Sequence, residues 1–459
     1  MSAMYNWGFE LKQLLRLMLP ILATQVAQAG FGLIDTIMAG QLSAADLAAI
    51  AIAVGIWLPV MLLCSGILMA TSPLIAEAIG AKRQQNIPVI THQALWIAIF
   101  LGLIGMLILQ LMPQFFHLLK VPENLHAKAG LFLHSIAFGI PAVALYSVLR
   151  CYCEALGHPH VVTIISLLAL PVLIPLNLIF MHGFAFIPAM GSAGAGVANA
   201  ILQWVMLFIL IAYLRYAKAF TQVKLFQQFD SLDPVWAKRI LKLGVPIGMA
   251  IFFEVSIFST AALVISPLGD TVIAAHQIAI SITSQLFMIP LSLAMALTIR
   301  VGQYYGAKNW QVMRQVQHIG FVVATVFASF TMLLLWLFRG WLIHLYNKDT
   351  AVFDVAYGLV IFAIAYQLID AWQVTAAGCL RGMQDTKGPM WITLFAYWII
   401  AFPLGIYLTR YALFSAAGVW IGLITGLFIA CILLFIRLRT TNNRLNQSGF
   451  YSKKVTNPF

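Results

Sequence analysis

The sequence predicts an all-α polytopic membrane protein. Hydrophobic residues make up 62% of the 459-residue chain, charged residues make up 9%, and the mean hydropathy is +0.95. These values lie far from the composition of soluble globular domains. A membrane-spanning helix needs about 20 mostly apolar residues, and the chain contains twelve such stretches joined by short connections. Little of the sequence is left over for a soluble domain.

The twelve apolar stretches form two groups of six, and we expect each to be a transmembrane helix. Their approximate limits are 14–38, 47–75, 91–112, 129–150, 161–181 and 190–214, then 240–265, 272–298, 316–338, 354–380, 390–409 and 415–437. The predicted domains are an N-terminal six-helix lobe (1–220), a cytoplasmic linker (221–238), a C-terminal six-helix lobe (239–440) and a cytoplasmic tail (441–459).

Basic residues are distributed unevenly between the two sides of the predicted membrane. If the N-terminus and every second connection share one side, that side holds most of the Lys and Arg residues. The other side holds only Lys120, Lys128, Arg339, Lys348 and Arg410. This bias is the positive-inside signal and predicts that both termini are cytoplasmic. The net charge of +12 therefore reflects membrane topology, and we expect no nucleic-acid partner.

The two halves of the chain resemble each other. Pro20 aligns with Pro246 at an offset of 226 residues, and the same offset superimposes "GAK" at 80–82 on "GAK" at 306–308. Later, "LRCYCEALGHP" from Leu149 resembles "LRGMQDTKGP" from Leu380. Because each half has an even number of spans, the two lobes are expected to be parallel. Parallel repeats of this kind are typical of transporters that alternate access by rocking their halves.

Three carboxylates lie well inside predicted spans. They are Asp35 in "FGLIDTIMAG", Glu254 in "FFEVSIF" and Asp370 in "AYQLIDAWQ". An acidic residue at the centre of a membrane costs roughly 2.5–3.5 kcal/mol unless it faces a polar interior. We find no Lys or Arg at the same depth in the sequence, so we expect no internal ion pair. Burial disfavours the charged form, so each carboxylate is expected to hold a proton or a cation that is exchanged against a positively charged solute.

Other polar residues of the spans could complete these sites. Tyr366 precedes Asp370 by four residues and therefore shares its helix face, and Gln367 borders that face. In the first half, three polar residues of the fourth to sixth spans could join Asp35, or they could be hydrogen bonds between helices. They are Tyr146, Asn177 and Asn199.

The sequence predicts neither a metal site nor a cofactor. The five cysteines show no C-x-x-C spacing, so we expect free thiols rather than disulfides or metal ligands. His276 has no second ligand at metal-binding spacing, and we expect a hydrogen-bonded interior histidine. The expected coupling agent is a cation, Na⁺ or H⁺.

The quoted motifs and the two parallel six-helix halves resemble the multidrug and toxic compound extrusion (MATE) family, and within it the bacterial NorM branch. The resemblance covers essentially the whole chain. It implies a V-shaped pair of lobes in the cell inner membrane, and export of amphipathic cationic drugs and dyes in exchange for Na⁺ or H⁺. It implies neither an enzyme nor an obligate protein partner.

The resemblance also assigns residues. Glu254, Tyr366 and Asp370 would form the cation site of the C-terminal lobe, with Phe287 as the aromatic residue near it. Asp35 would be the acidic residue of the N-terminal lobe. Other branches of the family carry a second acidic residue in the fifth span, where this chain has Asn177, which argues against their proton-relay model here.

Three other classes of membrane protein share some of these features. A major-facilitator transporter would carry a charged Gly-Asp-Arg-rich loop after the second span, where this chain reads "GAKRQQN". An intramembrane aspartyl protease would need a G-x-G-D signature, which is not in the sequence. A lipid-linked oligosaccharide flippase of the same superfamily is nearer, although such proteins place Arg or Lys in the central cavity to bind anionic diphosphates.

Overall fold

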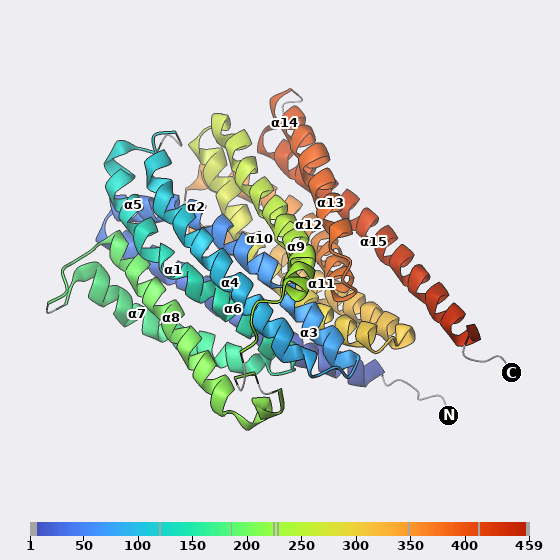
Figure 1. Cartoon of the computed structure of the whole chain (residues 1–459). Helices are drawn as coiled ribbons and strands as arrows, with labels where there is room; N and C mark the ends of the chain where they lie inside the picture. The colour runs from blue at the N-terminus through green and yellow to red at the C-terminus, as the bar shows by residue number, and fades with distance from the viewer. Residues whose placement is uncertain are drawn as a thin grey trace. The chain divides into compact units, whose positions relative to one another are not determined.

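The described part of the chain is almost entirely helical (Figure 1). The computed structural model describes residues 7–118, 121–184, 186–223, 225–226, 229–347, 349–411 and 414–455, with the side chains of 221–223 and 448–455 excepted. Eleven helical segments are long and apolar enough to span a membrane. A twelfth span results if Glu123–Ala137 and Ile140–Ala155, which meet at a bend of 43°, are taken as one broken span. The predicted set of apolar spans is thereby confirmed.

The described residues form two compact units. One unit comprises Leu19–Gly248, and the other comprises Met249–Phe459 together with the start of α1 up to Met18. We call them the N-terminal unit and the C-terminal unit. Two helices therefore change unit along their length: α1 (Trp7–Leu42) does so beside Pro20, and α9 (Pro234–Ile265) does so beside Pro246.

The N-terminal unit contains most of α1 and the helices that follow it. These are α2 (Ala44–Leu68), α3 (Thr71–Gly80), α4 (Asn86–Leu111), η1 (Met112–Phe115), α5 (Glu123–Ala137), α6 (Ile140–Ala155), α7 (Pro159–His182), α8 (Ser192–Tyr216) and η2 (Lys218–Val223). Helix α4 packs against α6, and α8 packs against both α5 and α7 (Figure 1). Phe116, Phe132 and Leu133 are fully buried in its apolar core.

The segment that follows η2 is held on the N-terminal unit by polar contacts with α4. His92 contacts the Leu225 carbonyl through Nε2 (2.7 Å) and the Asp230 carboxylate through Nδ1 (2.8 Å). The Gln93 side-chain amide donates to the Ser231 carbonyl (2.7 Å). These contacts tie the connection between the two sequence halves to the first half.

The C-terminal unit is organised around α12 (Thr350–Gly382). The other elements are the rest of α9, η3 (Ser266–Leu268), α10 (Asp270–Gly306), α11 (Trp310–Tyr346), α13 (Lys387–Thr393), the π-helical η4 (Leu394–Ala401), α14 (Phe402–Arg410) and α15 (Ser415–Val455). Helix α12 packs against α10, α11 and α15. The start of α1 belongs here because Glu10 accepts hydrogen bonds from Arg300 and Tyr304 of α10.

The sequence repeat is visible in the backbone. The two "GAK" motifs end α3 and α10, and Lys82 and Lys308 adopt left-handed φ angles of 56° and 54°. A left-handed residue after the last turn is a common way to end a helix, although glycine normally occupies it. Two unrelated loops would not be expected to share this unusual lysine conformation, so the repeat extends to local geometry.

Prolines bend or start the spans. Those inside helices are Pro20, Pro59, Pro171, Pro175, Pro246 and Pro290. Each removes one backbone hydrogen bond from its helix. Pro141 and Pro403 instead lie in the first turns of α6 and α14, where the missing N–H has no intrahelical partner to lose.

Candidate functional site

Asp35 is the centre of a polar site in the N-terminal unit. Its side chain projects from α1 and is 7% exposed. Asn177 of α7 donates to Oδ1 (2.7 Å), and Asn199 of α8 donates to Oδ2 (2.8 Å). The structure therefore brings three of the residues singled out in the sequence into contact, across three helices.

One hydrogen-bond acceptor of this arrangement, on Asn177, has no donor among the described residues. The Asn177 amide uses its nitrogen on Asp35, and its Oδ1 atom is buried without a hydrogen-bond partner among the described residues. A buried acceptor of this kind costs about 1–3 kcal/mol. The Asp35 site can therefore accommodate a proton donor or a cation that accepts oxygen ligands.

Tyr146 is not part of this site. Its hydroxyl lies 3.5 Å from the Ser166 hydroxyl of α7, and it precedes the buried Arg150 by four residues on α6. Among the described residues it makes no hydrogen bond to Asp35. The sequence placed Tyr146 in the correct unit, but it could not show which polar cluster the side chain joins.

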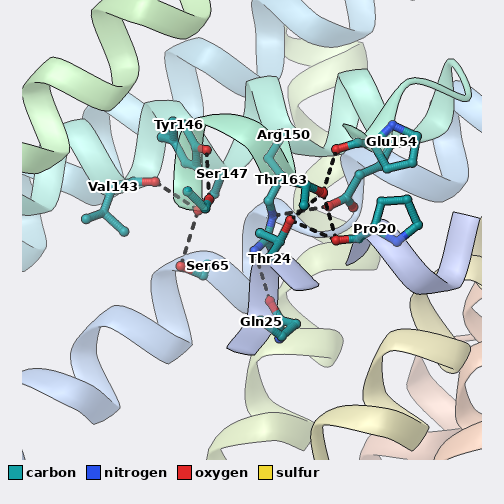
Figure 2. Close-up of polar contacts among 12 residues, drawn as sticks. Pro20, Thr24, Gln25, Ser65, Val143, Tyr146, Ser147, Arg150, Glu154 and Thr163 are labelled. Carbon is teal, nitrogen blue, oxygen red and sulfur yellow. Dashed lines mark hydrogen bonds and ion pairs between the residues drawn. The ribbon is translucent and has the colours of Figure 1, made fainter. Parts of the chain in front are cut away.

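The second polar cluster of the N-terminal unit contains a buried ion pair (Figure 2). Arg150 and Glu154 lie one turn apart on α6, with 3.7 Å between Nε and Oε1. The Arg150 guanidinium also donates to the Gln25 side chain of α1 (3.4 Å). The Thr163 hydroxyl of α7 donates to the Pro20 carbonyl (2.7 Å). A buried basic residue therefore lies near the end of α6, paired with a carboxylate one turn away.

The C-terminal unit brings Glu254, Tyr366 and Asp370 together. Glu254 lies on α9, and the other two share one face of α12. The Tyr366 hydroxyl hydrogen-bonds the Asp370 carboxylate, whose charge interacts with that of Glu254. Asp370 is 1% exposed and Tyr366 is 5% exposed. Helix α12 is unbroken from Tyr366 to Asp370, so these two residues share one helix face, as their four-residue spacing predicts.

In each carboxylate of this group, one oxygen atom accepts no hydrogen bond from the described residues. Glu254 Oε1 and Asp370 Oδ1 are buried without a hydrogen-bond partner among the described residues. Two neighbouring carboxylates in a medium of low polarity cannot both be ionised without a compensating cation. A proton or a Na⁺ ion would supply that compensation, and carboxylate and hydroxyl oxygens suit a hard cation.

Gln367 and Phe287 border the group rather than join it. Gln367 is buried and lines a small cavity with Pro290 of α10 and Phe327 of α11. Phe287 is partly buried on α10, and within the described part of the chain no ring contact joins it to Tyr366.

Three residues near the carboxylates were missed by the sequence analysis. Tyr397 of η4 interacts electrostatically with both carboxylates, and Phe258 of α9 lies edge-on to the Tyr366 ring, 6.3 Å between centroids. Phe258 follows Glu254 by one helical turn, a spacing that could have identified it. The Arg381 guanidinium, near the end of α12, acts electrostatically on Glu254.

The remaining sequence predictions concern cysteines and a histidine. All five cysteines are buried and free, as predicted. The described residues contain no cluster of three or more metal-ligating side chains. His276 packs edge-on to Trp420 at 5.9 Å, but its Nδ1 atom has no hydrogen-bond partner among the described residues. The expectation of a hydrogen-bonded histidine is therefore wrong at Nδ1.

Comparisons with known proteins agree with this description. The family model described as MatE matches residues 20–179 and 246–407, and these two matches begin 226 residues apart, at the offset of the internal repeat. A probable multidrug resistance protein NorM from Acinetobacter baylyi is 63% identical over 449 residues, covering 98% of this chain and 100% of the relative. Another from Shewanella oneidensis is 41% identical over 441 residues, covering 95% and 96%.

A solved structure extends the comparison to the fold. The crystal structure of the eukaryotic MATE transporter AtDTX14 matches with a TM-score of 0.86 at 20% identity, covering 96% of this chain and 99% of that one. At this level of identity the likeness concerns the fold alone.

Proposed function

Because the chain belongs to the MATE family, in its bacterial NorM branch, and is a multidrug efflux transporter, we propose that it exchanges amphipathic cationic drugs for Na⁺ or H⁺. The observation that carries this proposal is the pair Glu254 and Asp370, two interacting carboxylates that each keep a buried oxygen without a partner among the described residues. The wider setting is the inner membrane of a bacterial cell, with both termini cytoplasmic.

Coupling follows from the electrostatics of this pair. An empty pair of carboxylates is unfavourable in a medium of low polarity, so the C-terminal unit binds a cation readily. A cation that binds one access state more tightly than the other shifts the equilibrium between those states. Tyr366 supports the site by donating a hydrogen bond to Asp370. Release of the cation to the cytoplasm then restores the pair for another cycle.

Asp35 provides a second acidic site in the N-terminal unit. Its carboxylate accepts hydrogen bonds from two amide donors, Asn177 and Asn199, which offset part of the cost of burying its charge. When ionised it attracts a cationic drug or a coupling cation, and the Asn177 Oδ1 atom, which has no partner among the described residues, adds an acceptor. We assign Asp35 to substrate binding or to a second cation step.

The test is ethidium extrusion from cells that express the protein. Extrusion should increase with external Na⁺ at fixed pH, or should stop when the proton gradient is collapsed, and Asp370→Asn should abolish it. The matched control is Asp349→Asn, the same change at the exposed start of α12, which should extrude normally. Normal extrusion by a well-expressed Asp370→Asn variant would contradict the proposal.

The same assay addresses the flippase alternative. A flippase for lipid-linked oligosaccharides would leave ethidium tolerance unchanged, and its loss would alter the glycolipids of the cell envelope. Failure of extrusion under both conditions, combined with such a glycolipid change, would therefore replace the efflux proposal.

A further inference from the structure

Near the end of α11 a basic residue, Arg339, stacks on two aromatic rings. The central carbon of its guanidinium lies 3.8 Å from the centroid of the Tyr357 ring of α12 and 4.7 Å from that of the Trp336 ring of α11. A cation over the face of an aromatic ring is attracted by it. The other two cations that lie over a ring among the described residues each have only one.

The Tyr357 ring is itself held in a stack of rings between the two helices. It lies 5.5 Å from the Phe353 ring, one turn earlier on α12, at an interplanar angle of 27°. The Phe353 ring lies 4.4 Å from the His344 ring, in the last turn of α11, at an angle of 18°. Because the stack alternates between α11 and α12, it fixes the surface on which the Arg339 guanidinium rests.

The guanidinium lacks a counter-charge in the described part of the chain. Among the described residues no carboxylate lies within ion-pair distance of Arg339, and its Nε and Nη1 atoms are buried without a hydrogen-bond partner. Nη2 is the guanidinium nitrogen that is left open. A buried cation without a partner is costly, and the rings offset only part of that cost. An oxyanion at Nη2 would supply the missing charge, because a guanidinium suits phosphate and carboxylate oxygens.

The depth of Arg339 in the membrane indicates which anion it meets. The apolar stretch predicted for this helix, 316–338, ends at the residue before Arg339. Arg339 lies roughly 10 Å before the end of α11 at Tyr346, and Tyr357 lies roughly 10 Å after the start of α12 at Thr350. The stack is therefore at the border between hydrocarbon and headgroups, where Trp and Tyr concentrate. The abundant anions at this level are the phosphates of lipids.

The surface of α11 around the stack faces outward and is apolar. Trp336, whose ring Arg339 covers, is 56% exposed, and Leu337 and Trp341 are also exposed. Because α11 is long and apolar enough to span a membrane, we expect these side chains to contact acyl chains. A cationic group at headgroup level beside an apolar surface suits a lipid better than a soluble anion.

We propose that Arg339, held by Trp336 and Tyr357, binds the phosphate group of an anionic phospholipid at the membrane face where α11 connects to α12. The guanidinium supplies the charge, and Nη2 donates the hydrogen bond. The two ring faces hold the guanidinium in place, and the Tyr357 hydroxyl takes no part. The inference uses none of the buried carboxylates and therefore does not depend on the proposed antiport.

The first test measures lipid binding to the full-length purified protein in detergent. Phosphatidylglycerol is titrated in mixed micelles, and the rise in melting temperature gives the lipid concentration at half-saturation. Arg339→Gln should raise that concentration about tenfold, because the phosphate loses a charged hydrogen-bond donor. The matched control is Arg410→Gln, which removes an exposed basic residue from the end of α14, predicted on the same side of the membrane. It should leave the half-saturation unchanged.

The second test keeps the charge and removes one ring. Trp336→Leu should raise the half-saturating concentration of phosphatidylglycerol about threefold, because the guanidinium loses one of the two faces that hold it. Trp336 is exposed, so this variant is expected to fold and decides the question if Arg339→Gln does not. Native mass spectrometry of the same samples provides an independent readout: Arg339→Gln should retain one phosphatidylglycerol molecule fewer than the wild type.

Two further ligands identify the source of the phosphate. Phosphatidylcholine should bind the wild type more weakly than phosphatidylglycerol, because its choline cancels the charge. Inorganic phosphate should stabilise no more than chloride at equal ionic strength, because it has no acyl chains. The proposal is overturned if phosphatidylglycerol half-saturates Arg339→Gln and Arg410→Gln equally, or if the two lipids bind the wild type equally. Saturable stabilisation by inorganic phosphate that Arg339→Gln abolishes would also overturn it, since that result indicates a site for soluble anions.

Discussion

The two lobes hold their buried carboxylates in different ways. In the N-terminal unit both oxygens of Asp35 accept hydrogen bonds from asparagine amides. In the C-terminal unit Glu254 and Asp370 interact with each other, and each keeps a buried oxygen that has no partner in the described part of the chain. Amide donors offset part of the cost of burying a single charge, whereas two neighbouring carboxylates also repel each other and need a cation. The repeat thus provides one scaffold on which two different electrostatic tasks have been placed.

Neutralising the C-terminal pair of carboxylates should have the largest effect on efflux and on stabilisation by the coupling cation. In the double variant Glu254→Gln with Asp370→Asn, efflux should fall to the level of cells without the protein, because no group is left to exchange a cation. The purified variant should melt at one temperature with or without Na⁺ and across a pH series, whereas the wild type is stabilised by the coupling cation. A double variant that keeps cation-dependent melting would contradict the assignment.

Neutralising Asp35 should lower efflux without removing cation binding by the C-terminal pair. Asp35→Asn is expected to lower ethidium efflux by about tenfold, a change of 1.4 kcal/mol. Stabilisation by Na⁺ or acid should persist, because the C-terminal pair is intact. Melting curves of purified Asp35→Asn with and without the coupling cation check this. If the stabilisation disappears as well, the two sites are not independent.

Removing an amide donor tests how Asp35 is stabilised. Asn177→Ala leaves a buried carboxylate oxygen without its donor, so we expect a loss of about 1–3 kcal/mol of stability. The loss should be smaller when Asn177→Ala is made in the Asp35→Asn background, where no charge needs stabilising. Unfolding in detergent, arranged as a double-mutant cycle, measures the coupling. Equal losses in both backgrounds would show that Asn177 acts through packing alone.

The smallest effect is expected at the supporting hydroxyl. Tyr366→Phe removes the hydrogen bond that stabilises ionised Asp370, worth about 1 kcal/mol, so the cation concentration at half-saturation should fall severalfold while the maximal efflux rate changes little. Tyr357→Phe on the same helix, where the ring packs under Arg339, is the control. An unchanged half-saturation would remove Tyr366 from the site.

Much of this organisation could be read from the sequence, for identifiable reasons. The spans follow from apolar length, and the repeat follows from a constant offset between matching motifs. The pairing of Tyr366 with Asp370 follows from a four-residue spacing within one helix. Spacing carries no information on which helices are neighbours, so it left open whether Asn177 and Asn199 reach Asp35.

Interactions between residues far apart in the sequence explain why the sequence analysis missed some residues near the carboxylates. Arg381 lies at the end of α12, where a basic residue looks like an ordinary part of the charged membrane border. Its neighbour Asp385 is bound by Arg437, a residue more than 50 positions further along the chain. The sequence also left open whether Tyr146 joins Asp35, and the structure places its hydroxyl near that of Ser166 instead.

The first turns of α1 belong to the C-terminal unit and those of α9 to the N-terminal unit, which has a consequence for splitting the gene between the two sequence repeats. Because α1 starts in the C-terminal unit and α9 starts in the N-terminal unit, a cut in the connecting segment yields two fragments that each lack the opening turns of a helix their unit uses. Neither fragment contains a whole unit, although each contains a whole sequence repeat. Split genes cut there should yield a working transporter only when both fragments are made in the same cell.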